Sequence, residues 1–396
     1  MTTTPDSTPV TFVTPRYGAE VLGGAEAGAR QLATRLAADG REVSVITSCA
    51  LSMQTWADDF GAGRSVEDGV SVLRCPVDRQ RAADFDARSD ELLPRASSAA
   101  IDEALDWIDQ QGPTSSALIE AVGAVAAGVL VFYPYLYHPT VRGLPRARVP
   151  TILYPAAHRE LPLDLPVFDD VFGRVDGIAL QTRAEQALVQ QRFPASFSTP
   201  QALVGLPVEM GEKPDRDAAR EALGLGDEPF VLCLGRVDRG KGTHDLVERF
   251  GRFRAARGAG RLVLAGPVAE APPDVAGVTC LGPIPEEHKF GLIAAADVLI
   301  NPSFYESFSI VILEAWLAGT PVLVNGWCAP MVEHCTASGG GLHYTGVADF
   351  EIALSRLLDE PATRADLAAA GSDYVRRRYA WSAVSARLDG LIERVS

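Results

Sequence analysis

Lysine is scarce in this chain of 396 residues. It occurs only as Lys213, Lys241 and Lys289, and the remaining cationic residues of the chain are arginines. Acidic residues outnumber basic ones by 51 to 36, which gives a net charge of −15. This balance argues against a nucleic-acid partner, whose phosphates require a basic face, and gives no support for docking onto anionic membranes. The scarcity also draws attention to Lys241, which lies in a motif described below.

Paired cysteines are absent as well. The six cysteines are scattered over positions 49, 75, 233, 280, 328 and 335, and none forms a Cys-x-x-Cys motif. Four of them lie in or beside apolar, strand-like runs, where a free thiol behaves as a small apolar side chain. We therefore expect reduced thiols in a cytoplasmic protein.

Segments typical of export or membrane insertion are missing. Residues 1–9 contain neither a basic segment nor an apolar core, so they do not resemble a signal peptide. Residues 121–137 are uncharged, but the run is short for a membrane span and contains Gly123, Gly128 and Pro134. We expect a buried helix end there, followed by a core strand over residues 128–133.

Several well-known cofactor and catalytic motifs are also lacking. No Gly-x-Gly-x-x-Gly fingerprint follows a strand, which argues against a nicotinamide or flavin enzyme, and there is no Gly-x-x-x-x-Gly-Lys-Ser/Thr phosphate loop. The six histidines show no metal-ligand spacing, so no metal site is expected. No Gly-x-Ser-x-Gly elbow of the hydrolases is present.

The chain instead shows apolar strands that alternate with amphipathic helices. In the first half we expect strands at residues 10–14, 42–47, 70–74, 128–133, 151–154 and 177–181, helices at 25–39 and 183–192, and a partly helical region at 84–111. Residues 194–229 are rich in proline, serine, glycine and charge, and we interpret them as a connection that contains one short helix at 217–223.

The alternation then starts again. We expect strands at residues 230–234, 261–265, 278–281, 298–301 and 321–324, with helices at 243–257, 286–295, 309–317, 349–358, 362–378 and 382–394. This order predicts an α/β chain with two doubly wound, Rossmann-like domains. Ligands of such sheets bind beyond the carboxyl ends of the strands, so we expect a central cleft that both domains face.

The most informative motif contains two glutamates eight positions apart. Glu306 and Glu314 lie in a stretch where an apolar strand ends and a helix begins, and the helix around Glu314 is otherwise apolar. The N-terminus of a helix offers unpaired N–H groups and a partial positive charge to an anion. We expect backbone groups near Ser309 and Ile310 to hold phosphate and Glu314 to accept ribose hydroxyls; a structural ion pair in the core is the alternative for Glu314.

A second motif places two cations at the end of a strand. Arg236 follows the strand 230–234, and Lys241 lies five residues further on, in a turn bounded by Gly235 and Gly242. Two cations that converge there suit a diphosphate, since arginine offers a planar fork and lysine a point charge. A solvated basic turn is an equally good interpretation of this motif alone.

In the first half, Gly23 and Gly24 precede Glu26 at the start of a helix, and glycine lets a ligand approach the backbone closely. A plain tight turn explains the same pair. His138 and His158 each follow an expected strand, so both are expected near its carboxyl end. Such histidines are more often polar rim residues than catalysts.

Taken together, these residues resemble the family-4 retaining glycosyltransferases of the GT-B fold. The resemblance is strongest over residues 229–345. It implies an acceptor-binding domain at 1–205, rejoined by the C-terminal helix 380–396, and a donor-binding domain at 206–379. Glu306 and Glu314 match the glutamates that contact the donor sugar and the ribose, while Arg236 and Lys241 match the basic pair that holds the diphosphate.

The same resemblance implies the remaining site residues. Gly24, Ser307, Phe308, Ser309 and Ile310 would join the donor site, and His158 best matches the histidine near the reacting sugar. The implied acceptor-binding residues are Gly23, Glu26 and His138. Ser307 and Ser309 stand where the family often has glycine.

The implied reaction moves a hexose-type sugar from a UDP- or GDP-linked donor to a hydroxyl of an unknown acceptor, such as a glycan, a lipid-linked or a small molecule. The anomeric configuration would be retained, with no cofactor and no metal, since fixed cations would stabilise the leaving diphosphate. Two alternatives remain. A sugar-nucleotide epimerase shares the two-domain fold and needs no acceptor, and a non-catalytic protein would bind the nucleotide sugar without turnover.

Overall fold

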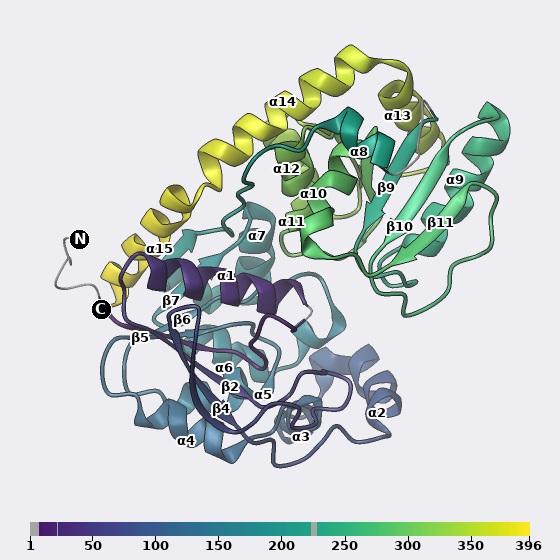
Figure 1. Cartoon of the computed structure of the whole chain (residues 1–396). Coiled ribbons are helices and arrows are strands. Elements are labelled where there is room, and N and C mark those ends of the chain that lie inside the picture. The colour runs from purple at the N-terminus through teal and green to yellow at the C-terminus, as the bar shows by residue number, and fades with distance from the viewer. Residues whose placement is uncertain (1–7, 22, 223–227) are drawn as a thin grey trace. The chain divides into compact units, whose positions relative to one another are not determined.

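The computed structural model describes residues 8–21, 23–222 and 228–396. The chain divides into two compact units, each with its own sheet, the first mainly and the second wholly parallel (Figure 1). The first unit contains the described residues up to Pro207 together with Val384–Ser396, and the second contains Val208–Ala383. The sequence analysis placed these divisions at residues 205/206 and 379/380.

The first sheet has the strand order β3-β4-β2-β1-β5-β6-β7-β8. All neighbours pair in parallel except β3 and β4, which are antiparallel. The strands are β1 Val10–Val13, β2 Val43–Ser48, β3 Gly63–Glu67, β4 Val70–Cys75, β5 Val129–Phe132, β6 Thr151–Leu153, β7 Gly177–Leu180 and β8 Gln201–Leu203. Every residue of β5 and β7 is buried, as expected where helices cover both faces of a parallel sheet.

The helices of the first unit pack on both faces of this sheet. Figure 1 shows α1 and α4 on opposite sides of its strands. The helices are α1 Gly24–Ala38, α2 Phe85–Leu92, α3 Ile101–Gln111, α4 Ser116–Ala124, α5 His138–Gly143, α6 Val167–Arg174 and α7 Arg183–Arg192, with short 3-10 turns at Leu93–Ser98, Leu144–Arg146, Leu161–Asp164 and Pro194–Ser198. The last helix, α15 Trp381–Val395, begins in the second unit and ends in the first.

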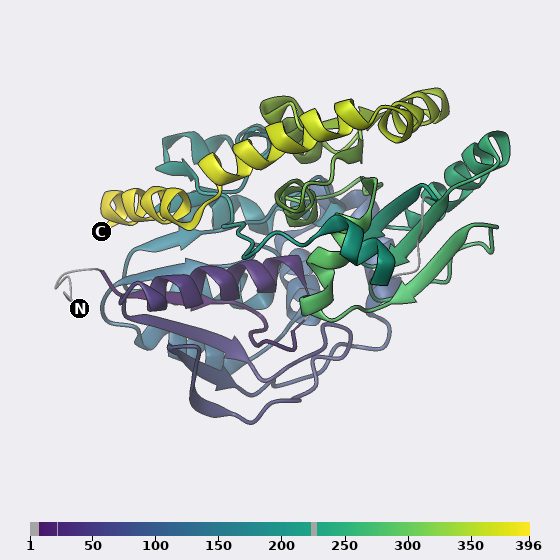
Figure 2. The same ribbon diagram turned by 45° about the horizontal axis from the view of Figure 1, so that its top comes forward.

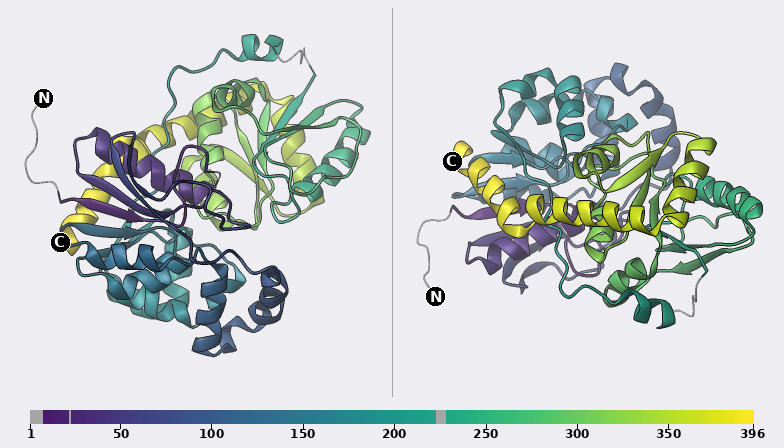
Figure 3. Two further views of the ribbon diagram at one scale, coloured as in Figure 1. Left: turned by 60° about the horizontal axis from the view of Figure 1, so that its bottom comes forward. Right: turned by 90° about the horizontal axis from the view of Figure 1, so that it is seen from above.

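The second sheet has the order β11-β10-β9-β12-β13-β14, and all its strands are parallel. They are β9 Phe230–Leu234, β10 Arg261–Ala265, β11 Val278–Gly282, β12 Val298–Asn301, β13 Val322–Asn325 and β14 Gly341–Tyr344. The helices are α8 Arg216–Ala222, α9 Thr243–Arg257, α10 Glu286–Ala295, α11 Ile310–Ala318, α12 Ala329–Ser338, α13 Val347–Asp359 and α14 Pro361–Arg378. Figures 2 and 3 show from other sides that helices flank each sheet on both faces.

The predicted α/β class with two Rossmann-like sheets is therefore confirmed. The connection expected over residues 194–229 is wrong in part, because β8 within it adds an edge strand to the first sheet. The edge strands β3 and β14 were not predicted, since exposed or glycine-rich residues give them no buried pattern. The short helix expected at 217–223 is α8, and Leu223 lies outside the described residues.

None of the helices in the described parts of the chain combines the length and hydrophobicity that a membrane-spanning helix needs. All six cysteines are free thiols, and five of them are buried. The expectation of unpaired thiols is thus confirmed for this fold.

The helix α11 is packed tightly against α14. Trp316 of α11 is fully buried, and its indole N–H donates to the carbonyl oxygen of Gly340 at 2.7 Å. Gly371 of α14 faces the ring so closely that an added Cβ would overlap it. The absence of a side chain at position 371 therefore permits this packing.

We predict that Gly371→Ala lowers the free energy of unfolding by about 1–3 kcal/mol, because the methyl group overpacks the Trp316 ring. Urea denaturation followed by circular dichroism measures the change. Gly291→Ala is the matched control, since Gly291 lies inside α10 and a Cβ there meets no atom within 4 Å. It should leave stability unchanged or raise it by about 0.5–1 kcal/mol; equal losses in both variants would contradict the packing argument.

Candidate functional site

The loop after β9 folds around one buried carboxylate. Asp238 is 7% exposed and accepts the backbone N–H of Lys241 at 2.7 Å. The same side chain accepts a hydrogen bond from Nε of Arg236, and the hydroxyl of Thr243 donates to the Asp238 carbonyl at 2.9 Å. These bonds fix the turn that carries the two cations singled out in the sequence.

This loop also lies against the next strand of the sheet. Gly242 has a φ of 74°, and a Cβ there would come within 2.6 Å of the Pro302 carbonyl oxygen, just beyond β12. Because β9 and β12 are neighbours, the two loops that follow them meet. As a result Nζ of Lys241 lies 2.9 Å from Oε1 of Glu306, with the two side chains 35% and 18% exposed.

The segment between β12 and α11 is held by side-chain amides. Asn301 donates to the hydroxyl of Ser309 at 2.8 Å and accepts the backbone N–H of Ser303 at 3.0 Å. Asn325 donates to the Pro302 carbonyl at 3.0 Å. Ser309 itself has φ 63° and ψ 62°, a left-handed conformation that costs a non-glycine residue about 1–2 kcal/mol. This backbone shape explains why glycine suits position 309, and Asn301 holds the serine in it.

Phe308 anchors the same segment to the core. Its ring is 3% exposed and packs edge-on against His334 and Tyr379, with ring centroids 5.1 Å away in both cases. Burial lowers the pKa of His334 to about 3, so its ring is neutral, and Nδ1 lies 3.1 Å from the hydroxyl of Tyr374. The side chain of Phe308 thus faces the core, and its backbone is the part that remains for a ligand.

The helix α11 follows directly and contains the second glutamate. Glu314 is 8% exposed, and its Oε1 lies 2.7 Å from Nζ of Lys289 on α10. Burial raises the pKa of Glu314 above its usual value, and the Lys289 ammonium offsets only part of that rise. Lys289 also pairs with Glu286 on its own helix.

In the first unit, the predicted Gly23 lies against another ion pair. Glu26, 7% exposed, pairs with Arg16, which also donates to the Leu51 carbonyl at 2.8 Å. Gly23 has a φ of 154°, and a Cβ there would collide with the carboxylate of Glu26. At Gly24, in contrast, a Cβ would meet nothing within 4 Å. Gly23 is therefore required by the fold, whereas Gly24 leaves open space at the start of α1.

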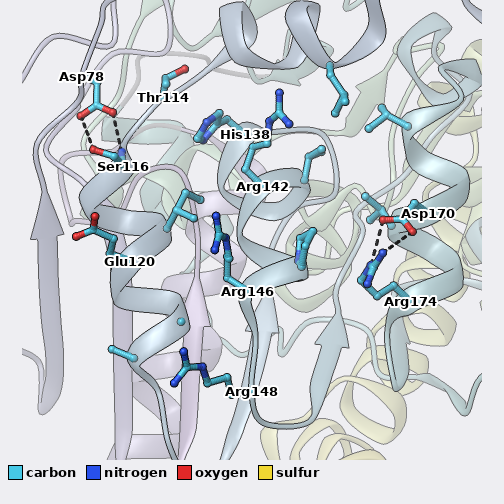
Figure 4. A pocket seen from close by; sticks show the side chains of 18 of the residues that line it. Asp78, Thr114, Ser116, Glu120, His138, Arg142, Arg146, Arg148, Asp170 and Arg174 are labelled. Carbon is cyan, nitrogen blue, oxygen red and sulfur yellow. Dashed lines mark hydrogen bonds and ion pairs between the residues drawn. The ribbon is translucent and has the colours of Figure 1, made fainter. Parts of the chain in front are cut away.

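The two predicted histidines have different surroundings. His158, 31% exposed at its side chain, lies 3.6 Å from Glu160. His138 is buried at the start of α5, 3.7 Å from Asp109 of α3, and burial lowers its pKa to about 4. It lines a groove of about 1150 Å³ between helices of the first unit. Figure 4 shows this groove, with Arg142 beside His138.

The structure thus places Arg236 and Lys241 in one loop, and it pairs Lys241 with Glu306 in a second loop that leads through Ser309 into α11. Sequence reasoning missed Asp238, which accepts hydrogen bonds from both cationic residues, and Lys289, which pairs with Glu314. The rarity of lysine was the one signal that pointed to Lys289. Within residues 8–21, 23–222 and 228–396, no three His, Cys, Asp or Glu side chains are grouped so as to hold a metal ion.

Comparisons with known proteins point to one family. Residues 228–360 match the family model described as glycosyl transferases group 1. The D-inositol 3-phosphate glycosyltransferase of Arthrobacter sp. (strain FB24) is 26% identical, over 90% of this chain and 86% of its own length. A GDP-mannose-dependent monoacylated alpha-(1-6)-phosphatidylinositol monomannoside mannosyltransferase of Corynebacterium glutamicum is 27% identical, but the match spans 51% of this chain and 59% of that protein.

Solved structures extend the similarity over nearly the whole chain. Sucrose-phosphate synthase of Thermosynechococcus elongatus has a TM-score of 0.71 at 19% identity, covering 98% of this chain and 99% of its own. HepE of Anabaena, solved in complex with UDP and glucose, has a TM-score of 0.70 at 14% identity, covering 98% and 100%. Identities this low establish the fold alone, and that fold is GT-B, as predicted.

We predict that Asp238→Ala weakens binding of inorganic pyrophosphate and lowers stability by about 1–3 kcal/mol, because the Lys241 N–H loses its acceptor. Asp238→Asn keeps an oxygen for that N–H and should be milder. Calorimetric titration and thermal denaturation measure both effects. Glu270→Gln is the control, since Glu270 forms an exposed pair with Arg239 of the same loop. Unchanged binding in Asp238→Ala would refute the role of Asp238.

Proposed function

We propose that this chain, whose residues 228–360 match the group 1 glycosyl transferase model and whose fold is GT-B, transfers a hexose-type sugar from a nucleoside diphosphate sugar to an acceptor hydroxyl. We further propose that the anomeric configuration is retained and that no metal ion or other cofactor is needed. The observation that supports this best is the ion pair of Lys241 with Glu306, which lies in the segment leading into α11, together with the Asp238 carboxylate, which binds both Arg236 and the backbone N–H of Lys241.

The charge of the leaving group is the main barrier in this reaction. When the bond between the anomeric carbon and the phosphate oxygen breaks, the nucleoside diphosphate gains a negative charge. Arg236 is 52% exposed at its side chain and is free to turn from Asp238 toward a diphosphate. Lys241 and the unpaired N–H groups at the start of α11 add fixed positive potential at the same place. In this proposal Arg236, Lys241 and the first N–H groups of α11 together stabilise the charge of the leaving diphosphate, which a metal ion does in other transferases.

Glu306 has two tasks in this scheme. Without a ligand it neutralises Lys241 at 2.9 Å. When the diphosphate takes over Lys241, the carboxylate becomes available to accept hydrogen bonds from hydroxyls of the donor sugar. Glu314 would accept the ribose hydroxyls, and the backbone of Ser307, Phe308, Ser309 and Ile310 would hold phosphate. The acceptor hydroxyl would attack from the face of the departing phosphate, which takes its proton.

The similar proteins suggest the classes of donor and acceptor. One is named as GDP-mannose-dependent and another was solved with UDP and glucose, so both nucleotides are candidates. Relatives named for D-inositol 3-phosphate or a phosphatidylinositol mannoside suggest a polyol or lipid-linked hydroxyl. In the first unit, His158 and Gly24 would approach the reacting sugar, and Gly23, Glu26 and His138 would belong to the acceptor region. The free thiols fit a cytoplasmic location.

One assay distinguishes this proposal from its alternatives. Thermal shift with UDP, GDP and their sugars first identifies the donor, since a specific ligand raises the melting temperature. That donor is then incubated alone, with inositol-type and sugar acceptors, and with excess EDTA, and the product anomer is read by NMR. Transfer with retention in EDTA is expected. Conversion of the donor alone to an epimer, binding without turnover, or inversion would each refute the proposal.

We predict that Lys241→Met lowers kcat by about 10²–10³-fold, as expected when one group that stabilises a developing anion is lost. Steady-state kinetics at saturating donor measure this effect. Arg239→Met removes a cation from the same loop, but that side chain is 76% exposed and pairs with Glu270, so activity should stay near wild type. Wild-type kcat in Lys241→Met would exclude the diphosphate role.

A further inference from the structure

A second lysine–glutamate pair lies behind the first. Nζ of Lys289 on α10 is 2.7 Å from Oε1 of Glu314 on α11, and the side chains are only 17% and 11% exposed. No other residue of α11, which reads Ile-Val-Ile-Leu-Glu-Ala-Trp-Leu-Ala, is charged. The pair therefore stands in an otherwise apolar helix.

Stability does not explain such a pair. Removing two charges from water costs several kcal/mol per ion. Proteins in which apolar residues of similar volume replace such a pair are often equally stable or more stable. Loss of Lys289 alone, however, would leave a buried carboxylate without a counter-charge. A pair that brings little stability is best understood through what the carboxylate does when it is held in place.

The contacts of Glu314 indicate that task. Lys289 occupies Oε1, and among the described residues no hydrogen bond is donated to Oε2. The helix that carries Glu314 begins at Ile310, directly after the loop that contains Glu306, the partner of Lys241. The second oxygen is thus an unused acceptor about one turn into the helix whose N-terminus serves the diphosphate.

We propose that Lys289 is a positioning residue for ribose recognition: it fixes Glu314 so that Oε2 accepts hydrogen bonds from the ribose hydroxyls of the donor nucleotide. This inference rests on the proposed function, because it concerns the nucleotide of the same donor. It assigns to α10 a part in selecting ribonucleotides over 2′-deoxyribonucleotides. Lys289 itself touches Glu314 and not the substrate.

The charges of the pair make the pH dependence of nucleotide binding a useful measurement, because a purely structural role of Lys289 would leave that pH dependence unchanged. The charged groups that shift the pKa of Glu314 are both on α10: Lys289 lowers it and Glu286 raises it, while burial raises it most. The helix α14, which packs on α11 through Gly371 and Trp316, adds no charged group to this set. Without Lys289 the remaining influences all raise the pKa, so the carboxyl takes up a proton at a higher pH. Affinity for a ribonucleotide is then lost as the pH falls through that raised pKa.

The test measures binding of UDP and GDP, and of their 2′-deoxy and 3′-deoxy analogues, by calorimetry from about pH 5.5 to pH 8. We expect Lys289→Met to weaken binding of the ribonucleoside diphosphate about tenfold, which is the order expected for the loss of one hydrogen bond to a charged group. The Lys289→Met protein should bind ribonucleotides and deoxyribonucleotides equally well. Its loss of ribonucleotide affinity on acidification should begin at a higher pH than in the wild type. Lys289→Arg keeps the cation and should restore both properties.

Two further variants keep the test decisive. Glu286→Gln breaks the outer contact of Lys289, where Glu286 is 78% exposed, and should bind like wild type. If Lys289→Met does not fold, Lys289→Gln replaces it: its amide still donates to Glu314 but carries no charge. Affinity should then be nearly normal at about pH 8 and lost toward about pH 5.5.

The possible failures are distinguishable. A wild-type protein that binds no nucleoside diphosphate would refute the proposed function itself. The role of Lys289 would be refuted by a different result. In that result the wild type binds and prefers ribose, and a folded Lys289→Met or Lys289→Gln protein shows the same preference for ribose and the same pH profile of binding. The proposed function would then still stand.

Discussion

The pairing of lysine with carboxylates around α11 is the interaction on which the rest of the site depends. Glu306 and Glu314 are both largely withdrawn from water, and each is matched by a single ammonium group, on Lys241 and Lys289. The third lysine, Lys213, lies so close to the C-terminal end of α11 that a Cβ at Gly319 would overlap it, and a cation there opposes the negative end of the helix dipole. All three lysines thus lie against α11 or against the loop that leads into it. In a protein of net charge −15, Lys241 places a positive charge against the loop that leads into α11, where the proposed anionic ligand would bind.

Rigidity of the loop before α11 complements this charge arrangement. Asn301 and Asn325 tie residues 302–309 to the ends of two adjacent strands, and Phe308 fixes the loop to the aromatic core beside Tyr379. Ser309 is held in a left-handed conformation by a hydrogen bond from Asn301. Donors that are already in position need no reorganisation when charge develops on a ligand, and this is how fixed dipoles and cations contribute most to a reaction. The left-handed backbone of Ser309 is energetically unfavourable, and the surrounding hydrogen bonds and packing of this loop maintain it.

Much of the fold was predictable, because a parallel strand covered by helices on both faces is a short, continuously apolar run such as β5 or β9. Edge strands break this rule. The residues of β3 are mostly exposed, and β14 begins at a glycine in a glycine-rich stretch, so neither showed a pattern. The strand β8 was hidden in a segment whose proline and serine content suggested a connection. Strands at the edge of a sheet require few apolar residues, and hydrophobic periodicity is the main signal by which a strand is found in a sequence.

The sequence by itself determined the helix start near Glu306, the two cations that follow β9, and the absence of a dinucleotide fingerprint, since each depends on residues close together in the chain. Only the tertiary structure decided which groups meet. Lys289 and Glu314 are 25 positions apart, and Lys241 and Glu306 are 65 apart, so no local spacing encodes either pair. The contacts exist because β9 and β12 are neighbours in the sheet and because α10 packs beside α11. Strand order is set by the burial of the whole sheet, which no single segment of the sequence can specify.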